Sequence, residues 1–362
     1  MLLNPDNILL VKSHSMGIGD LLRSSAAWVA LKRKWPHAKL HLLMLSKHAG
    51  YPSEELIREH ELLSTTTFVT VKSGNPGMIG QKNLSLRRIF TAIDEQLHAQ
   101  PIDMVIDCEP YGIKTSLITR RMGRLKKAVT VGIAQFPLRK YFYDISAPSL
   151  PDYLKNKHLT LPLDYTERDF VVLAPLGIDR EGTRISMKVS PQGLEWQLAH
   201  PVHKNETVKL VTLNIGCGTA DALNKRPAIA VLAHCLAELY ERQRFTLWLS
   251  GAGFERNINE EFAKALHLVL SQKNLQCEII DWAGQCTLSQ LTGLLACSDL
   301  VISTDSGPYH MAVALDVPTV CWFNFETIPS LHHAENVRNL ILPAPKELAA
   351  AAMELLQPTG QA

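Results

Sequence analysis

Short apolar runs alternate with amphipathic stretches along most of the chain. Runs such as 8–11 and 104–107 predict buried strands, and stretches such as 21–34 and 258–270, in which apolar residues recur every three or four positions, predict helices. The expected strands are 8–11, 40–44, 68–71, 104–107, 129–133, 208–214, 245–249, 278–280, 300–303 and 319–323. The expected helices are 21–34, 84–100, 115–122, 229–243, 258–270, 288–297, 308–315 and 346–356. This alternation predicts an α/β protein with parallel sheets.

The alternation is interrupted once, by an irregular stretch with five prolines between positions 148 and 191. Such a stretch indicates a connection between two domains. We expect an N-terminal domain over 1–170, a C-terminal domain over 171–345, and a last segment, 346–362, that packs back on the N-terminal domain. Ligands of open parallel sheets bind beyond the carboxyl ends of strands, so the loops after strands are the places to search for chemistry.

Composition excludes several classes of protein. The chain has 362 residues, of which 46% are hydrophobic and 20% are charged, which is typical of globular proteins and excludes disordered and fibrous ones. The net charge of +2 is too small for a general polyanion binder. Residues 1–170 hold 23 Lys and Arg against 16 Asp and Glu, a charge of +7, whereas 171–362 hold 14 against 19, a charge of −5. The basic half suits an acidic substrate or a membrane surface, although uneven surface charge alone is an alternative.

The sequence also predicts a compartment. Pro5 and Asp6 interrupt the apolar N-terminus where a secretory signal needs an unbroken core, and no apolar run approaches the roughly 20 residues that span a bilayer. Seven scattered cysteines form no CxxC pair, which argues against a disulfide framework and a zinc site. We expect a reduced, cytoplasmic protein.

The sharpest candidate segment follows the expected strand 300–303. Pro308 suits the first position of a helix, and Gly307 lets the backbone approach a ligand closely. The free N–H groups of such a helix start suit a phosphate, and Asp305 could contact a sugar or nucleotide hydroxyl. The alternative is that Ser306 or Asp305 only caps the helix. His310 either joins the anion site or is structural.

A second candidate loop, 12–20, follows the first strand. Gly17 and Gly19 permit a tight turn, and Asp20 stands where a helix begins. A carboxylate in that position could accept a proton from a substrate hydroxyl, or it could simply favour the helix start. The loop is not a dinucleotide fingerprint, because Leu22 occupies the place of the third glycine.

Three further segments carry candidate charges. Lys225 and Arg226 follow a glycine-bearing turn after strand 208–214 and could neutralise a diphosphate, or they could be a solvated pair. Glu255 follows strand 245–249 and could bind ribose hydroxyls, or it could be a solvated first-turn acid. The basic segment 120–127 could meet a phosphorylated acceptor or anionic lipid head groups, or it could be a solvated helix end.

Taken together, four motifs resemble glycosyltransferase family 9, the ADP-heptose:lipopolysaccharide heptosyltransferases. They are Ser-Met-Gly-Ile-Gly-Asp-Leu-Leu at 15–22, Asp-Met-Val-Ile-Asp at 103–107, Asn-Lys-Arg-Pro at 224–227, and Asp-Ser-Gly-Pro-Tyr-His-Met-Ala-Val-Ala-Leu at 305–315. They stand in the family's order, and the resemblance covers positions 8 to about 323. It implies a GT-B fold, in which two Rossmann-like domains face each other across a cleft.

The resemblance also implies an activity: inverting transfer of a heptose or related sugar from an ADP-sugar to a hydroxyl of a lipopolysaccharide core or similar acceptor. Asp20 matches the catalytic base and Lys225 the lysine that contacts the diphosphate. The implied donor-binding residues are Gly218, Thr219, Lys225, Arg226, Glu255, Cys286, Thr304, Asp305, Ser306, Gly307 and His310. The implied acceptor-binding residues are Ser15, Met16, Gly17, Gly19, Arg23, Arg120, Arg121 and Arg124. No metal or other cofactor is expected, nor nucleic acid; peripheral contact with the cytoplasmic face of the inner membrane fits the acceptor.

The chain departs from the family in two places. Asn324 and Phe325 stand where the family commonly has glycine and proline, beside the expected donor site, and Arg23 begins an Arg-Ser-Ser run where the family prefers small residues and a proline. Two other functions stay open: a nucleotide-sugar epimerase or hydrolase of similar shape, and a non-catalytic nucleotide-sugar-binding subunit. The presence of both Asp20 and Lys225 argues against the second.

Overall fold

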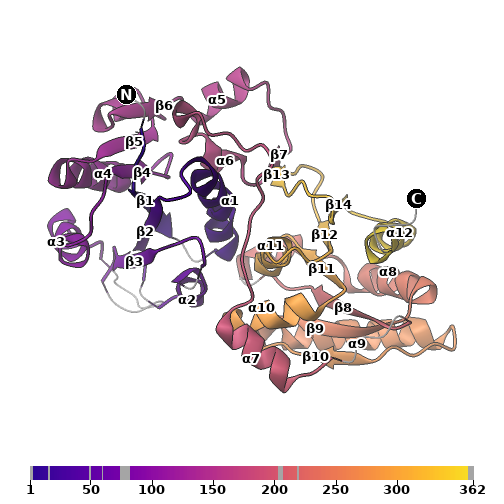
Figure 1. Cartoon of the computed structure of the whole chain (residues 1–362). Helices are drawn as coiled ribbons and strands as arrows, with labels where there is room; N and C mark the ends of the chain where they lie inside the picture. Colours follow the sequence, from indigo (N-terminus) through magenta and orange to yellow (C-terminus); the bar gives the residue numbers. More distant parts are fainter. Residues whose placement is uncertain are drawn as a thin grey trace. The chain divides into compact units, whose positions relative to one another are not determined.

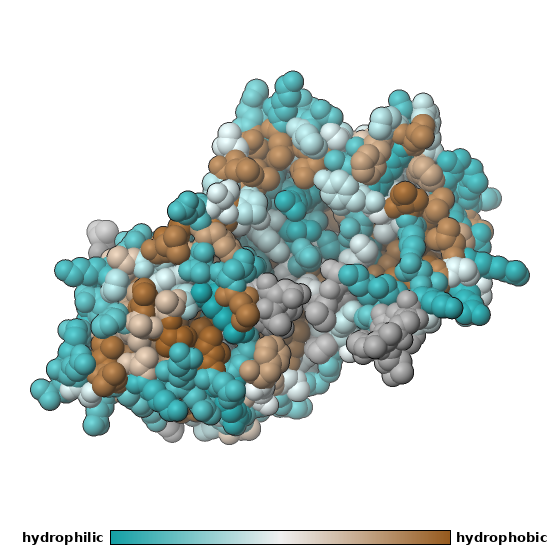
Figure 2. Space-filling view, turned by 180° about the vertical axis from the view of Figure 1, so that it is seen from behind, coloured by the Kyte–Doolittle hydropathy of each residue, from teal (hydrophilic) through white to brown (hydrophobic). Residues whose placement is uncertain are grey.

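The computed structural model describes residues 3–14, 17–48, 50–58, 60–73, 82–202, 207–217 and 220–357. The chain forms two compact units, Met1–Ile185 and Ser186–Ala362, each built on a six-stranded parallel sheet with helices packed against it (Figure 1). In Figure 2 the visible surface is mostly hydrophilic, with hydrophobic residues in separate patches. None of the described helices is long and apolar enough to cross a membrane.

The first unit has the strand order β3-β2-β1-β4-β5-β6. Its strands are β1 (Asn7–His14), β2 (Lys39–Ser46), β3 (Thr65–Thr70), β4 (Met104–Asp107), β5 (Val129–Ile133), β6 (Ile145–Ala147) and the short β7 (Leu163–Asp164). Its helices are α1 (Ile18–Lys34), α2 (Pro52–Arg58), α3 (Leu86–Leu97), α4 (Ile113–Lys126), η1 (Arg139–Phe142), α5 (Leu150–Asn156), α6 (Glu167–Phe170) and η2 (Ala174–Leu176). The order reverses between β1 and β4, so the loops after these strands lie at the switch point where ligands of such sheets bind.

The second unit repeats this topology as β10-β9-β8-β11-β12-β14. Its strands are β8 (Lys209–Asn214), β9 (Phe245–Ser250), β10 (Ile279–Asp281), β11 (Leu300–Thr304), β12 (Thr319–Phe323), β13 (Ser330–Leu331) and β14 (Val337–Ile341). Its helices are α7 (Pro191–Ala199), η3 (Ala220–Lys225), α8 (Ile229–Arg242), η4 (Gly253–Glu255), α9 (Arg256–Ser271), α10 (Leu288–Cys297), α11 (Gly307–Ala314) and α12 (Pro345–Leu356). Here the switch point lies between β8 and β11.

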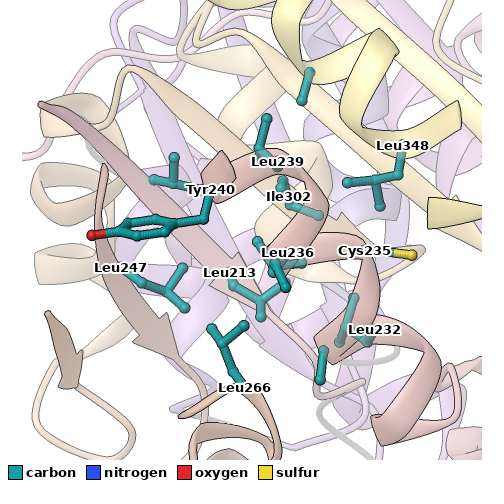
Figure 3. Packing of buried hydrophobic residues seen from close by; sticks show 14 of the residues in the cluster. Leu213, Leu232, Cys235, Leu236, Leu239, Tyr240, Leu247, Leu266, Ile302 and Leu348 are labelled. Atoms are coloured by element: carbon teal, nitrogen blue, oxygen red, sulfur yellow. The ribbon is translucent and has the colours of Figure 1, made fainter. Parts of the chain in front are cut away.

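The core of the second unit lies between its sheet and the helices α8, α9 and α12. In Figure 3, Leu236 of α8 lies beside Leu213 of β8, and Leu232 and Ile302 belong to the same buried cluster. All four side chains are at most 1% exposed. Their burial, at roughly 2 kcal/mol for each fully buried aliphatic side chain, stabilises the sheet edge that carries the candidate groups.

The last helix, α12, packs within the second unit, and the expected packing of 346–362 on the N-terminal domain stays a prediction. Leu348, Ala349 and Ala352 of α12 are fully buried in the core of the second unit, and Leu348 lies beside α8 in Figure 3. The physical reason is the alanine-rich face of α12, because small side chains let two helices approach closely.

The expected boundary after residue 170 also differs from the structure, in which 171–185 belong to the first unit. This segment runs along the end of α1. Nζ of Lys34 donates to the carbonyl of Leu176 over 2.6 Å, and a guanidinium nitrogen of Arg33 donates to the carbonyl of Glu181 over 2.8 Å. These contacts keep residues 171–185 in the first unit, and the second unit begins at Ser186.

The proline-rich stretch is more regular than expected. Pro151 and Pro191 lie in the first turns of α5 and α7, whose starts are capped by the hydroxyls of Ser149 and Ser190. Proline is well suited to a first helical turn, so these residues begin helices and do not mark a structureless connection.

Candidate functional site

The carboxyl ends of β8 and β11 lie side by side at the switch point of the second unit. Oγ1 of Thr304 donates to the carbonyl of Gly216 over 2.9 Å, and Nδ2 of Asn214 donates to Oγ of Ser306 over 3.0 Å. Thr304 and Asn214 are both buried, and a buried polar group without a partner is costly. This network therefore holds the loops after β8 and β11 in one arrangement.

Lys225, the last residue of η3, lies against the loop after β11. Its Nζ donates to Oδ2 of Asp305 over 2.6 Å and to the main-chain carbonyl of Asp305 over 2.9 Å. An ammonium carries three N–H groups, so one remains after these two bonds. The structure thus brings together two predicted site residues and holds a positive charge beside the start of α11.

The start of α11 is suited to an anion. Ser306 is the N-cap residue, but its side chain makes no capping hydrogen bond; its hydroxyl donates to the carbonyl of Thr304 over 3.2 Å. Neither Asp305 nor Ser306 caps the helix with its side chain, so the capping alternative is wrong. Gly307 is the first residue of α11, and the helix dipole favours negative charge beside its main-chain N–H.

Glu255 lies in the adjacent loop, after β9, and is only 3% exposed. Its Oε2 accepts from the main-chain N–H of Ala252 over 2.8 Å, and its Oε1 lies 3.4 Å from the guanidinium of Arg226. A Cβ on Gly216 would lie 1.9 Å from Oε1, so only glycine leaves room for this carboxylate. The alternative of a solvated first-turn acid is wrong, and so is that of a solvated Lys225-Arg226 pair, because both cations contact acids.

His310 lies in α11 with its ring buried. Its Nδ1 is 2.9 Å from Nε2 of His332, and its Nε2 is 3.9 Å from Oδ1 of Asp305. A neutral imidazole has one protonated nitrogen. If Nδ1 of His310 donates its proton to His332, Nε2 carries none and cannot donate to Asp305. His332 was not singled out by the sequence, because the His332-His333 pair matches none of the motifs.

Asn324 begins the loop after β12, where the family commonly has glycine. Its amide nitrogen donates to the carbonyls of Asn224 and Arg226, over 2.8 and 3.0 Å. These two carbonyls flank Lys225 in the chain. The departure from the family therefore has a definite local effect: a side-chain amide holds the segment that carries the lysine.

The remaining predicted donor residues are less informative. Cys286 follows β10 and is half-buried; burial raises the pKa of its thiol to about 11, partly offset by its contact with Trp196. The thiol is therefore neutral at neutral pH. Gly218 and Thr219 lie outside the described residues.

In the first unit, Asp20 lies in the first turn of α1 with its side chain 55% exposed. A guanidinium nitrogen of Arg23 lies 3.1 Å from its Oδ1. Nε of the same Arg23 lies 3.2 Å from Oδ2 of the buried Asp169 in α6, and Nζ of Lys12 lies 3.6 Å from Oδ1 of Asp169. Asp20 is thus reachable from solvent, while the arginine that holds it is fixed by a buried ion pair.

Asp169 was not predicted as part of the site, and Lys12 was predicted only as the first residue of the candidate loop 12–20. Burial alone would raise the pKa of Asp169, but the charges of Lys12 and Arg23 and a hydrogen bond from Ser24 lower it below its ordinary value. Asp169 lies far along the chain from α1, and sequence spacing carries no signal for such a contact.

The other predicted acceptor residues lie in two places. Gly17 is the N-cap residue of α1 and Gly19 is buried within the helix, whereas Ser15 and Met16 lie outside the described residues. The arginines of α4 are separate: Arg121 pairs with Asp94 of α3. Arg120 and Arg124 lie on the outer face of α4, where Arg120 donates to the carbonyl of Tyr141 over 2.9 Å. Among the described residues, no group of three or more His, Cys, Asp or Glu side chains could hold a metal ion.

Residues 232–345 match the family model of glycosyltransferase family 9 (heptosyltransferase). A comparison with curated proteins found no match.

Solved structures show the same fold over nearly the whole chain. A glycosyl transferase family 9 protein from Veillonella parvula aligns with a TM-score of 0.68 at 17% identity, covering 98% of each chain. The E. coli ADP-heptose lps heptosyltransferase II aligns with a TM-score of 0.61 at 16% identity, covering 97% of this chain and 98% of that one. E. coli heptosyltransferase WaaC, solved with ADP-2-deoxy-2-fluoro heptose, aligns with a TM-score of 0.57 at 17% identity over the same shares.

The fold is therefore the expected GT-B class, with two Rossmann-like units that have their candidate groups at the carboxyl ends of parallel strands. Within that class, residues 232–345 match the model of the family that the four motifs led us to expect, and the solved structures show its fold.

Proposed function

We propose that the protein transfers a heptose or related sugar from an ADP-sugar to a hydroxyl of a lipopolysaccharide core or similar glycoconjugate. One observation carries the donor half of this proposal: the loops after β8, β9 and β11 gather Lys225, Glu255 and the uncapped start of α11 at one switch point. A diphosphate needs a cation and N–H donors, and a ribose needs a carboxylate. Two structures of the same fold, E. coli heptosyltransferase WaaC with ADP and with ADP-2-deoxy-2-fluoro heptose, support an ADP-sugar as the donor.

The proposed reaction is a single inverting displacement. The acceptor hydroxyl gives its proton to the carboxylate of Asp20 as its oxygen bonds to the anomeric carbon of the sugar. The bond between that carbon and the phosphate oxygen breaks, and the nucleoside diphosphate leaves with the bonding electrons. The third N–H of Lys225 and the main-chain N–H of Gly307, at the start of α11, would stabilise the negative charge that grows on the leaving oxygens.

We propose that no metal ion is needed, because the leaving charge is assigned to Lys225 and to main-chain amides. Turnover is therefore expected to be unchanged after treatment with a chelator. We further propose that Glu255 contacts the ribose, that Arg226 supports Glu255, and that the acceptor lies near Asp20 and Arg23 of the first unit.

A transfer assay tests the proposal. The protein is incubated with ADP-heptose and a deacylated lipopolysaccharide core that lacks its terminal heptose, and the acceptor is weighed by mass spectrometry. The proposal predicts an acceptor heavier by one heptose residue and release of ADP, with no product from UDP- or GDP-sugars.

The same assay separates the competing functions. Conversion or hydrolysis of the donor at full rate without any acceptor would favour an epimerase or hydrolase and contradict the proposal. Tight binding of the ADP-sugar in titration calorimetry, without turnover on any acceptor tried, would favour a non-catalytic binding subunit.

A further inference from the structure

His332 follows the short strand β13 and is buried, yet the reaction proposed above gives it no role. Its Nε2 lies 2.9 Å from Nδ1 of His310 in α11, and the planes of the two rings are 78° apart. When two neutral imidazoles meet through one nitrogen each, one must donate and the other accept, because a neutral ring has a single N–H. The pair therefore has two arrangements, which differ in what His310 presents to the loop after β11.

The main chain of His332 is fixed by a closed set of hydrogen bonds. Its N–H donates to the hydroxyl of Tyr309 over 3.0 Å, and that hydroxyl donates to Oδ1 of Asn339 in β14 over 2.7 Å. Nδ2 of Asn339 in turn donates to the carbonyl of His332 over 2.9 Å. The ring of Tyr309, which is also buried, lies 5.0 Å from the ring of His332. These contacts hold the imidazole of His332 against His310.

The carboxylate of Asp305 favours one of the two arrangements. Its Oδ1 lies 3.9 Å from Nε2 of His310, and its Oδ2 accepts from Nζ of Lys225 over 2.6 Å. If His310 donated through Nδ1, the lone pair of its Nε2 would face a carboxylate oxygen, and the two would repel each other. If His332 donates, the proton of His310 is on Nε2, and this N–H faces Oδ1 with the attractive sign. A doubly protonated His310 would add a second buried cation near Lys225, which is costly.

We infer that His332 is a positioning residue for the proposed transfer and that it acts by donating from Nε2 to Nδ1 of His310. His310 is then kept as the tautomer with its proton on Nε2. At 3.9 Å from Oδ1 of Asp305, this N–H is too distant for a hydrogen bond and attracts the carboxylate electrostatically. Asp305 is thus held on one side by His310 and on the other by Lys225, which defines where the ammonium meets the leaving diphosphate.

The inference rests on the proposed function for the role of Lys225, whereas the tautomer of His310 is a property of the protein without substrate. Nuclear magnetic resonance of the full chain, labelled with ¹⁵N in its histidines, shows which ring nitrogen carries the proton. The signals of His310 are assigned with the variant His310→Gln. The expected result is a proton on Nε2 of His310 alone. A proton on Nδ1, with or without one on Nε2, would overturn the inference.

Two substitutions separate the hydrogen bond of His332 from its volume. His332→Leu fills much of the space but cannot donate to His310, so kcat/KM for the donor is expected to fall by about tenfold. His332→Gln places an amide N–H near the former position of Nε2 and is expected to keep kcat/KM within about threefold of the wild type. Equal losses in the two variants, with both folded by circular dichroism, would show that only volume matters and would overturn the inference.

His333 provides the matched control, because it is the next residue in the chain and is exposed. His333→Leu is expected to keep kcat/KM within about twofold of the wild type. If His332→Leu does not fold, the spectrum of the wild type and the turnover of His332→Gln still decide the question. Absence of transfer by the wild type would contradict the proposed function. Transfer by the wild type with a proton on Nδ1 of His310 would contradict this inference alone.

Discussion

At the scale of single residues, the second unit surrounds one lysine with specific partners. Asp305 accepts two bonds from Nζ of Lys225, and the amide of Asn324 holds the carbonyls on either side of it in the chain. The side chain of a lysine is flexible, but here Asp305 fixes its ammonium group and Asn324 fixes its main chain, so the position of the charge is well defined. This is the feature from which the proposed stabilisation of a leaving diphosphate follows.

Replacement of Asn324 by alanine tests the role of the amide. Asn324→Ala removes two hydrogen bonds, at roughly 1 kcal/mol each, so we expect the KM for the donor to rise by about tenfold. Asn224→Ala is the matched control, because it keeps the main-chain carbonyl that accepts from Asn324, and its KM is expected to stay unchanged. Equal KM values for the two variants would show that the amide does not support the donor site.

Asp169 makes the stability of the first unit depend on pH. Its pKa is lowered in the folded state, so its stabilisation is present above the unfolded value of about 3.9 and is lost as pH falls below that value. Urea unfolding of the wild type is therefore expected to show a marked loss of stability as pH falls below about 4. Asp169→Asn is expected to cost about 3–5 kcal/mol at neutral pH, because Lys12 and Arg23 lose their buried partner, and to flatten the acid dependence. An unchanged acid slope in the variant would contradict this account.

At the scale of elements, the sequence predicted most of what forms the two sheets. The expected strands 104–107, 129–133 and 319–323 coincide with β4, β5 and β12, because a buried central strand in a parallel sheet is a short run of apolar residues between polar loops. β14 was missed because Val337–Ile341 interleaves Arg338 and Asn339 with apolar residues at the sheet edge. The extension of α1 back to Ile18 was missed because glycines at 17 and 19 read as a loop.

The residues of the candidate site also fall into those that the sequence could predict and those that it could not. The residues on strand-following loops, such as Lys225, Asp305 and His310, could be named from their motifs. Asp169 and His332 could not, because their contacts join segments distant in the chain and arise from packing. The docking side of α12 was also beyond the sequence, since an alanine-rich face predicts a close contact but not with which element.

Packing of α12 on α8 leads to a stability prediction. Leu348 is fully buried in the core of the second unit, so Leu348→Ala is expected to lower the free energy of unfolding of that unit by about 2–5 kcal/mol. Lys346→Ala, on the exposed side of the same helix, is expected to change it by less than about 0.5 kcal/mol. Hydrogen exchange resolves the two units, and faster exchange confined to the first unit in Leu348→Ala would contradict the assignment of α12.

At the scale of the whole molecule, the two units have the same strand topology but a different net charge, positive in the first half of the chain and negative in the second. In both sheets the strand order reverses between the first and the fourth strand of the unit. The polar groups near the two reversals differ: the first unit has Asp20 paired with Arg23, and the second has Lys225 beside the start of α11. In the proposed reaction, Asp20 of the first unit takes the proton and Lys225 of the second unit stabilises the leaving charge.

The next prediction concerns which nucleoside diphosphate the protein binds. A thermal-shift comparison of ADP, UDP and GDP is expected to show stabilisation by ADP alone, by roughly 5 °C or more at a concentration well above its Kd. Stabilisation by UDP or GDP equal to that by ADP would contradict an ADP-sugar donor. Lys225→Ala is expected to abolish the shift with ADP, because the diphosphate loses its cation.

The most direct test of the account is the turnover of Asp20→Asn, measured beside its affinity for the donor. Asparagine keeps the size of the side chain but cannot take the acceptor proton, so kcat is expected to fall by about 10²–10⁴-fold while the Kd for the ADP-sugar stays within about twofold. Glu181→Gln, an exposed carboxylate of the same unit, serves as the control and is expected to keep full activity. Wild-type turnover in Asp20→Asn would contradict the role of Asp20 as the base.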